Sequence, residues 1–351
     1  MDVSDLVIDG DTPGVAWRLP VFRFSGTVPA APSVYIQAAL HAGELPGTAL
    51  AHFLLGALAE AEARGAIRGD ITVVPHANPI GLAQSHFGEM QGRFDLGSRT
   101  NFNRDFPLVP LSGRDGLLEN LGTFSAVERL KRHVLHTALG ADLVLDLHCD
   151  DESLQYAYLH SVFWPGAADL AEALDMDAVF LSDGASTAFE EAVAHAFRMD
   201  APHDGLPAGR LAVTVELRGL ADVDRDTAKR DAAGLLRFLA MRGVVAAEAG
   251  SPHSFDGPVL PLDWVEMIRA PEAGTVLFHR RVGDRVKAGD GLATIIARPG
   301  FADGEVTLHA PQDGLVVTRV SRRYVRRNGD LMKIACAGPS ARQRPPGTLE
   351  D

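Results

Sequence analysis

The sequence predicts an α/β domain followed by a small all-β domain. From about residue 33 the chain alternates short apolar runs with longer helical patterns, as α/β proteins with parallel strands do. After Pro261 the pattern changes to short β-like runs separated by glycines. This second part contains an internal repeat, because residues 270–276 (APEAGTV) match residues 310–316 (APQDGLV).

The elements of the first domain follow from its apolar runs and helical spacing. Residues 34–39 are predicted to form a buried strand, and residues 46–64 an Ala/Leu-rich helix with Pro46 in its first turn. Residues 81–120 are rich in Gly, Asn, Arg and Phe without periodicity, and a loop region of that length is typical of a functional site. The remaining predictions are strands at 71–74, 143–147 and 211–215 and helices at 125–139, 166–175, 187–198 and 223–242.

Proline content marks the boundary between the two domains. Three prolines in residues 251–261 indicate a linker. We therefore expect one domain over residues 1–255 and a β domain over residues 262–337, in which the two repeats bury a shared face. Residues 338–351 are expected to be a frayed tail.

Length and composition agree with this division and limit the partners. A chain of 351 residues is expected to hold about two domains, and 46% apolar with 23% charged residues is the composition of a globular protein. The net charge of −13 repels phosphate backbones and anionic lipid. We expect neither nucleic acid nor a membrane as a partner.

The cytoplasm is the expected location. The first ten residues contain three aspartates and no basic cluster, unlike a secretory signal, and no apolar run approaches the ~18 residues of a membrane span. Only two cysteines occur, Cys149 and Cys336, which indicates a reducing compartment. The oligomeric state stays open, and a homo-oligomer is compatible with the sequence.

Candidate metal ligands and acid–base residues stand where predicted strands end. His41 and Glu44 follow the first strand, and His148 and Glu216 each follow a later one. Ligands of open α/β sheets bind beyond the carboxyl ends of the strands, so these loops can converge. Two imidazoles and one carboxylate form a catalytic zinc set with a fourth position for water, whose pKa zinc lowers to roughly 7. Desolvation would raise the pKa of Glu216, as a general base and acid requires.

Nearby polar residues indicate supporting roles. Asp146 would lie on the same face of its strand as the histidine two residues later and accept the second imidazole N–H. Asn103 and Arg104 combine an amide with a guanidinium fork, which suits capture of a substrate carboxylate. Either Arg93 or Arg99 could stabilise the oxyanion of a tetrahedral intermediate.

Five short motifs occur in the order in which one enzyme family carries them. They are LHAGELPG (40–47), NPIGL (78–82), NFNR (101–104), DLH (146–148) and VELRG (215–219). Together they resemble the succinylglutamate desuccinylase and aspartoacylase family, relatives of the carboxypeptidase A type zinc peptidases. The resemblance implies a zinc carboxypeptidase-like mixed sheet flanked by helices, with a C-terminal β domain near the active-site mouth.

The resemblance also implies a role for each candidate residue. These roles are His41, Glu44 and His148 as ligands of one zinc ion per chain, Glu216 as catalytic acid and base, and Asn103 with Arg104 as binders of the substrate carboxylate. The family's oxyanion arginine is expected about eight residues before Arg104, where Leu96 stands, so Arg93 is preferred to Arg99. The acidic run at residues 150–152 (DDE) favours an acyl amino acid with a cationic side chain over a dicarboxylate.

Each candidate taken alone also has an ordinary structural explanation. His41 and Glu44 could be a turn histidine and a helix-start glutamate, His148 a core histidine, and Glu216 the partner of Arg218. The ordered set of motifs favours the metal and catalytic roles.

The second domain resembles the biotinyl/lipoyl barrel-sandwich fold, above all in residues 282–290 (VGDRVKAGD). A carrier of that fold presents a lysine at the hairpin tip between the repeats, and residues 297–305 (ARPGFADGE) contain none. We therefore expect a structural or substrate-gating domain.

These inferences predict a zinc-dependent amidohydrolase that removes an acyl group, such as acetyl or succinyl, from an N-acyl amino acid. A metallocarboxypeptidase acting on short peptides needs the same parts and is the first alternative. A noncovalent binding module with a degenerate catalytic domain is the second. The missing carrier lysine and the intact His/Glu/His set argue against the binding module.

Overall fold

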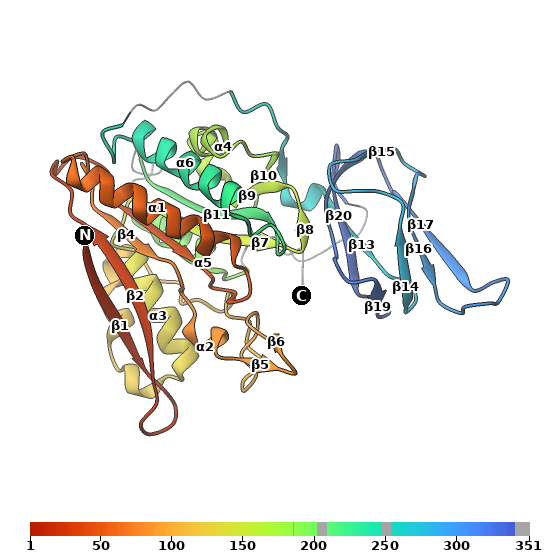
Figure 1. Cartoon of the computed structure of the whole chain (residues 1–351), viewed down its shortest axis with the longest axis horizontal. Coiled ribbons are helices and arrows are strands. Elements are labelled where there is room, and N and C mark those ends of the chain that lie inside the picture. The colour runs from red at the N-terminus through yellow and green to blue at the C-terminus, as the bar shows by residue number, and fades with distance from the viewer. Residues whose placement is uncertain (185, 202–208, 248–253, 341–351) are drawn as a thin grey trace.

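A nine-stranded sheet forms the centre of the larger part of the molecule, in the order β1-β2-β4-β3-β7-β11-β9-β10-β12 (Figure 1). The structure is a computed structural model that describes residues 1–184, 186–201, 209–247 and 254–340. The strands of this sheet are Asp2–Asp9 (β1), Ala16–Phe24 (β2), Val34–Ala38 (β3), Ile71–Val74 (β4), Leu143–Asp150 (β7), Gln155–Leu159 (β9), Ala178–Leu181 (β10), Leu211–Gly219 (β11) and Val259–Pro261 (β12).

The large sheet is mixed. Strands β4, β3, β7 and β11 run parallel at its centre, whereas β1 and β2 on one side and β9 on the other bring in antiparallel pairs. The four central strands were predicted from their apolar runs and are confirmed, and β7 and β11 extend past their predicted ends. Strand β1 was not predicted, because an edge strand that leaves most of its side chains at least partly exposed carries little apolar pattern.

Helices cover both faces of the sheet. Gly47 of α1 lies against Leu147 of β7, close enough that a Cβ at Gly47 would come within 2.8 Å of the Leu147 Cβ. On the opposite face Phe189 of α5 contacts the ring of Tyr35, with ring centroids 6.2 Å apart. The five longer helices of the described residues were predicted and are confirmed: Pro46–Ala63 (α1), Ala126–Ala138 (α3), Ala168–Ala173 (α4), Phe189–Met199 (α5) and Arg225–Met241 (α6).

The region at residues 81–120, expected to be a long loop, contains only short elements. Pro79–Leu82 (α2) leads into it, and Ser85–His86 (β5) pairs with Glu89–Met90 (β6) in a small hairpin. Three short 3₁₀ turns follow, at Leu111–Gly113, Asp115–Leu118 and Leu121–Thr123.

The C-terminal part forms two further sheets, with the orders β13-β20-β18-β15 and β17-β16-β14-β19 (Figure 1). Each sheet takes two strands from each sequence repeat, so neither copy could complete a sheet without the other. The strands are Val265–Arg269 (β13), Gly274–Phe278 (β14), Arg285–Val286 (β15), Gly291–Ile296 (β16), Glu305–His309 (β17), Gly314–Arg319 (β18), Tyr324–Val325 (β19) and Asp330–Cys336 (β20).

The expected linker is partly structured. Val259–Pro261 pairs in parallel with β10 and therefore forms the last strand of the large sheet, while residues 251–253 lie outside the described residues. At the other end of the chain, the Ser340 backbone N–H donates to the carbonyl of Asp263 at 2.8 Å, so the start of the expected tail is held. Residues 341–351 lie outside the described residues.

An apolar cluster joins the two parts of the molecule. Tyr156 and Phe180 of the large sheet pack with Val265 and Val317 of the C-terminal sheets. The short strand Glu152–Ser153 (β8), directly after β7, pairs with β18. In the part of the chain that the structure describes, no helix has both the length and the apolar character needed to span a bilayer.

Candidate active site

His41 and Glu44 lie in the loop between β3 and α1. Ala39, the first residue after β3, has a φ of 56°, and this left-handed conformation turns the chain sharply at the strand end. The His41 Nδ1 atom lies 2.9 Å from Glu44 Oε1, and both side chains are buried. The loop therefore presents an imidazole and a carboxylate side by side beyond the sheet edge.

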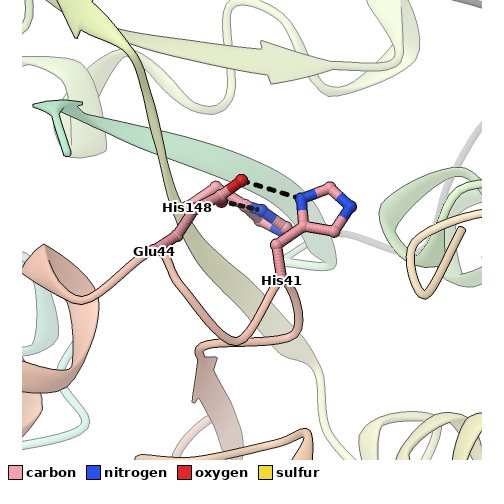
Figure 2. Close-up of side chains that lie close together, drawn as sticks. All are labelled: His41, Glu44 and His148. Atoms are coloured by element: carbon pink, nitrogen blue, oxygen red, sulfur yellow. Dashed lines mark hydrogen bonds and ion pairs between the residues drawn. The ribbon is translucent and has the colours of Figure 1, made fainter. Parts of the chain in front are cut away.

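His148 reaches the same point from β7. Its Nδ1 atom lies 2.7 Å from Glu44 Oε2, so one carboxylate bridges two imidazoles (Figure 2). Potential ligand atoms of His41, Glu44 and His148 all lie within 4.8 Å of one another. The structure thus brings together the three residues that the sequence proposed as metal ligands, and this group could hold a metal ion.

The outer nitrogens of both imidazoles have their own partners. His148 Nε2 lies 2.9 Å from Asp146 Oδ2, as predicted, and His41 Nε2 lies 2.8 Å from Asn101 Oδ1, which the sequence analysis had not assigned. An imidazole that donates through Nε2 keeps the lone pair of Nδ1 for a metal. The donor set therefore fits a zinc ion in both ligand type and orientation.

Burial and charge shift the pKa values of all three side chains, and the carboxylates of Asp146 and Glu44 outweigh burial to raise that of His148 well above its usual value. Burial lowers the pKa of His41, which keeps its imidazole neutral. Burial alone would raise the pKa of Glu44, but the neighbouring imidazoles of His41 and His148 outweigh it and hold that pKa well below its usual value. Glu44 is therefore a carboxylate ready to bind a cation.

Glu216 lies beside His148 in the register of β11 and β7 and lines the same cavity. Burial raises its pKa to about 8, against the opposing effect of His148. Its Oε2 atom is buried and has no hydrogen-bond partner among the described residues. Arg218, its proposed ordinary partner, instead contacts Asp231 and Gln155.

Asn103 is fixed by the start of α5. The backbone N–H of Phe189 donates to Asn103 Oδ1 at 2.8 Å, so the amide takes the place of a helix cap and its Nδ2 lies 3.4 Å from His148 Nε2. The ammonium of Lys131 donates to the carbonyls of Asn101 and Arg104, at 3.1 and 2.7 Å, and so holds the loop that contains Asn103 in place. Asn103 and Arg104 both line the cavity.

Arg93 lies beside His41 and Glu44, whereas Arg99 does not line the cavity. The Arg93 Nη1 atom lies 3.3 Å from Glu44 Oε1 and 3.4 Å from His41 Nδ1. The cavity lining includes Arg93, and Arg99 is not part of it. Of the two candidate arginines, Arg93 therefore borders the cavity beside His41 and Glu44, and its catalytic role stays a prediction.

The acidic run after His148 borders the cavity through Asp150 and Asp151, and two of its three carboxylates are paired with cations of the protein. Asp150 pairs with the ammonium of Lys333 at 2.6 Å, and Glu152 pairs with Arg319 and, at 2.9 Å, with Arg323. These cations come from the C-terminal sheets and neutralise the two carboxylates. Asp150 and Glu152 therefore have little charge left for a ligand, and the cationic substrate expected from this run stays a prediction.

Several residues line the cavity that the sequence analysis did not single out. The cavity measures about 280 Å³, small enough for one amino-acid-sized ligand. Its unexpected members include Tyr158, Glu190, Glu191 and Lys333. No local motif marks them, because each reaches the cavity through tertiary packing.

Comparisons with known proteins agree with this arrangement. Residues 30–242 match the family model of the succinylglutamate desuccinylase/aspartoacylase catalytic domain. No curated protein sequence matches the chain significantly.

Solved structures of similar shape cover nearly the whole chain. A succinylglutamate desuccinylase/aspartoacylase family protein from Shewanella amazonensis has 27% identity and a TM-score of 0.85, over 96% of this chain and 99% of that one. Another from Shewanella frigidimarina has 25% identity and a TM-score of 0.83, over 96% and 97%. The ectoine utilization protein EutE from Ruegeria pomeroyi, at 19% identity and a TM-score of 0.73 over 96% and 95%, shares the fold.

The family model spans most of the chain and includes the loops that hold His41, Glu44, His148 and Glu216. The chain therefore belongs to the succinylglutamate desuccinylase/aspartoacylase family.

Proposed function

We propose that the protein is a zinc-dependent amidohydrolase that removes an acyl group from an N-acyl amino acid. One observation carries the proposal: His41, Glu44 and His148 converge in a cavity that also contains Glu216. Membership of a family of deacylases supports the same reaction class.

His41, Glu44 and His148 are the proposed ligands of one zinc ion per chain. When bound, zinc would supply a Lewis acid that polarises an amide carbonyl and makes water acidic enough to attack near neutral pH. Asp146 and Asn101 hold the two imidazoles in the required orientation through their outer nitrogens.

Arg104 and Asn103 are the proposed binders of the substrate α-carboxylate. A guanidinium fork beside an amide can hold both carboxylate oxygens, which fixes the scissile amide in the cavity. Arg93 lies next to Glu44, where its positive charge would stabilise the oxyanion that develops on the carbonyl oxygen.

Glu216 is the proposed acid–base residue. Its unpartnered, buried oxygen can accept a proton from the attacking water as the new C–O bond forms. The same proton then passes to the amine nitrogen as the C–N bond breaks. A pKa raised to about 8 by burial suits both transfers near neutral pH.

The remaining proposals concern the whole chain. We assign residues 1–255 to a zinc carboxypeptidase-like catalytic domain and residues 262–337 to a barrel-sandwich domain without a carrier lysine. The contact of β8 with β18 supports a structural role for the second domain. The cytoplasm is the proposed location.

The first test combines metal analysis with substrate screening. Wild-type protein should contain about one zinc per chain and hydrolyse N-acetyl or N-succinyl amino acids, and His148→Ala should lose both properties. Glu216→Ala should keep the zinc and lose about 10²- to 10⁴-fold in kcat. Glu60→Ala, on the exposed side of α1, is the control for mutation itself.

Three results would contradict the proposal. They are the absence of zinc after gentle purification and zinc add-back, wild-type activity in Glu216→Ala, and hydrolysis of blocked dipeptides as fast as acyl amino acids. The last result would favour a metallocarboxypeptidase.

A further inference from the structure

Glu190 is a buried carboxylate in the cavity that the proposed deacylation does not use. It follows Phe189 in the first turn of α5, is 4% exposed and lines the cavity. Its Oε1 atom accepts one long hydrogen bond, 3.3 Å, from the backbone N–H of His160. Within the described ranges no cation pairs with Glu190, and the buried Oε2 atom of its neighbour Glu191 has no hydrogen-bond partner.

An unpaired buried carboxylate is costly unless a ligand compensates for it. Buried charges in proteins are normally paired, since desolvation otherwise destabilises the charged form. The charged groups that act on Glu190 are Glu191 and Asp146, and both are acidic. Burial and these carboxylates raise the pKa of Glu190 well above its usual value. In the free protein this carboxyl therefore favours its protonated form, and the fold supplies no cation that would ionise it.

Glu190 lies next to the residues proposed to bind the substrate carboxylate. The backbone N–H of Phe189, its chain neighbour, donates to Asn103 Oδ1 at 2.8 Å. The backbone of Asp105, which follows Arg104, donates to Thr187 Oγ1 at 3.1 Å. The first turn of α5 is thus tied to the carboxylate-binding loop, and an amino acid held by that loop would direct its side chain within reach of α5.

We propose that Glu190 binds a cationic group at the end of the substrate's amino-acid side chain, so that the preferred substrates are N-acyl derivatives of basic amino acids. The inference rests on the proposed deacylase function and names its substrate class. A side-chain ammonium or guanidinium supplies the missing partner through a charge-assisted hydrogen bond. Asp150 also lines the cavity, but its charge is already paired with Lys333.

Other side chains fit this position less well. A second carboxylate would add negative charge beside Glu191 and Asp146 and would leave Glu190 without a counter-charge. A neutral apolar side chain would leave Glu190 buried and unpaired after binding, which is unfavourable. A cationic side chain can pair with Glu190 and so offset the cost of burying it. Substrates that carry such a side chain should therefore bind preferentially.

Matched substrates test the proposal. Nα-acetyl and Nα-succinyl derivatives of lysine, ornithine, norleucine and glutamate should be compared with wild type, Glu190→Gln and the exposed-site control Glu60→Gln. Wild type should prefer the lysine or ornithine derivatives over norleucine. Glu190→Gln should lose about 10- to 100-fold in kcat/KM on the basic derivatives and change little on norleucine. Glu190→Asp, which keeps the charge, should retain the preference if Glu190→Gln fails to fold.

Calorimetric measurement of amino-acid binding tests the role of Glu190 independently of catalysis. Lysine should bind metal-stripped wild-type protein more tightly than norleucine, and Glu190→Gln should remove that difference. If no acyl amino acid is hydrolysed, the proposed function fails, and the calorimetric difference still supports or rejects the role of Glu190. If the protein deacylates norleucine or glutamate derivatives as well as basic ones, and Glu190→Gln leaves the ratio unchanged, the inference is overturned while the deacylase function stands.

Discussion

Two acidic segments border the cavity, and only one of them is neutralised. Asp150 and Glu152 receive cations from the C-terminal sheets, and Lys333 reaches Asp150 from a position 183 residues further along the chain. Glu190, in contrast, has no cationic partner in the residues described, and its neighbour Glu191 only adds negative charge. Similar side chains therefore have opposite roles within one cavity.

Pairing within the protein decides whether an acidic side chain near a site can bind a ligand. A carboxylate that is paired within the protein stabilises the fold and offers little to a ligand. The pairing of Glu152 accompanies a backbone contact, because Arg319 lies opposite Glu152 in the register of β18 and β8. The first segment therefore joins the two parts of the molecule, and the second is left for the substrate.

Removing the cation that pairs with Asp150 should have the largest effect on stability. Lys333→Met would leave Asp150 mostly buried without its cation, since their side chains are 8% and 16% exposed. Loss of one partner of such a pair costs about 3–5 kcal/mol. The free energy of unfolding, measured by denaturant titration, should fall by that amount.

The exposed Lys287→Met is the matched control and should leave the unfolding free energy within about 0.5 kcal/mol of wild type. Adding Asp150→Asn to Lys333→Met should recover part of the loss, because it removes the uncompensated charge. A double variant no more stable than the single one would mean that the pair does not stabilise the fold through charge.

Much of the fold and of the candidate site could be predicted because it depends on local pattern. Apolar runs located β3, β7 and β11, and the polar residues at their ends follow from the strand boundaries. His41, His148 and Glu216 meet because the carboxyl ends of parallel strands share one edge of a sheet. The role of Asp146 followed from the two-residue period of a strand.

The remainder depends on contacts between distant segments, which no local pattern records. The acidic run at residues 150–152 could not be interpreted without Lys333, and the orientation of Glu190 depends on how α5 packs against Asn103. Strand β9, which pairs antiparallel with β11, and strand β10, which pairs in parallel with β9, were not predicted. β12 was missed because Pro261 within it and Pro258 before it indicate a linker.

Replacing Glu190, which has no cationic partner among the described residues, should change the free energy of unfolding less than Lys333→Met does. The change should be an increase. The pKa of Glu190 is raised in the folded protein above its ordinary value of 4.5, so above about pH 4.5 the folded state binds more protons than the unfolded state. This contribution to stability is therefore lost as pH rises, until the folded pKa is passed. Glu190→Gln should gain little at pH 5 and about 1–2 kcal/mol at pH 9.

Thermal and denaturant unfolding of wild type and Glu190→Gln across this pH range would measure the gain. The raised pKa of Glu216 gives a similar slope in both proteins, so its effect cancels in the difference. A gain that is constant with pH would show that the substitution acts through packing rather than through charge.

The smallest loss in the free energy of unfolding is expected from removing the exposed ion pair between Arg323 and Glu152. Arg323 is 46% exposed and Glu152 30% exposed, so water and salt screen their attraction. Glu152 also keeps its contact with Arg319 when Arg323 is removed. Arg323→Ala should therefore lower the free energy of unfolding by less than about 1 kcal/mol, and the loss should shrink at high salt. A loss as large as that of Lys333→Met would mean that the contact between the two parts depends on the surface charges rather than on the buried pair.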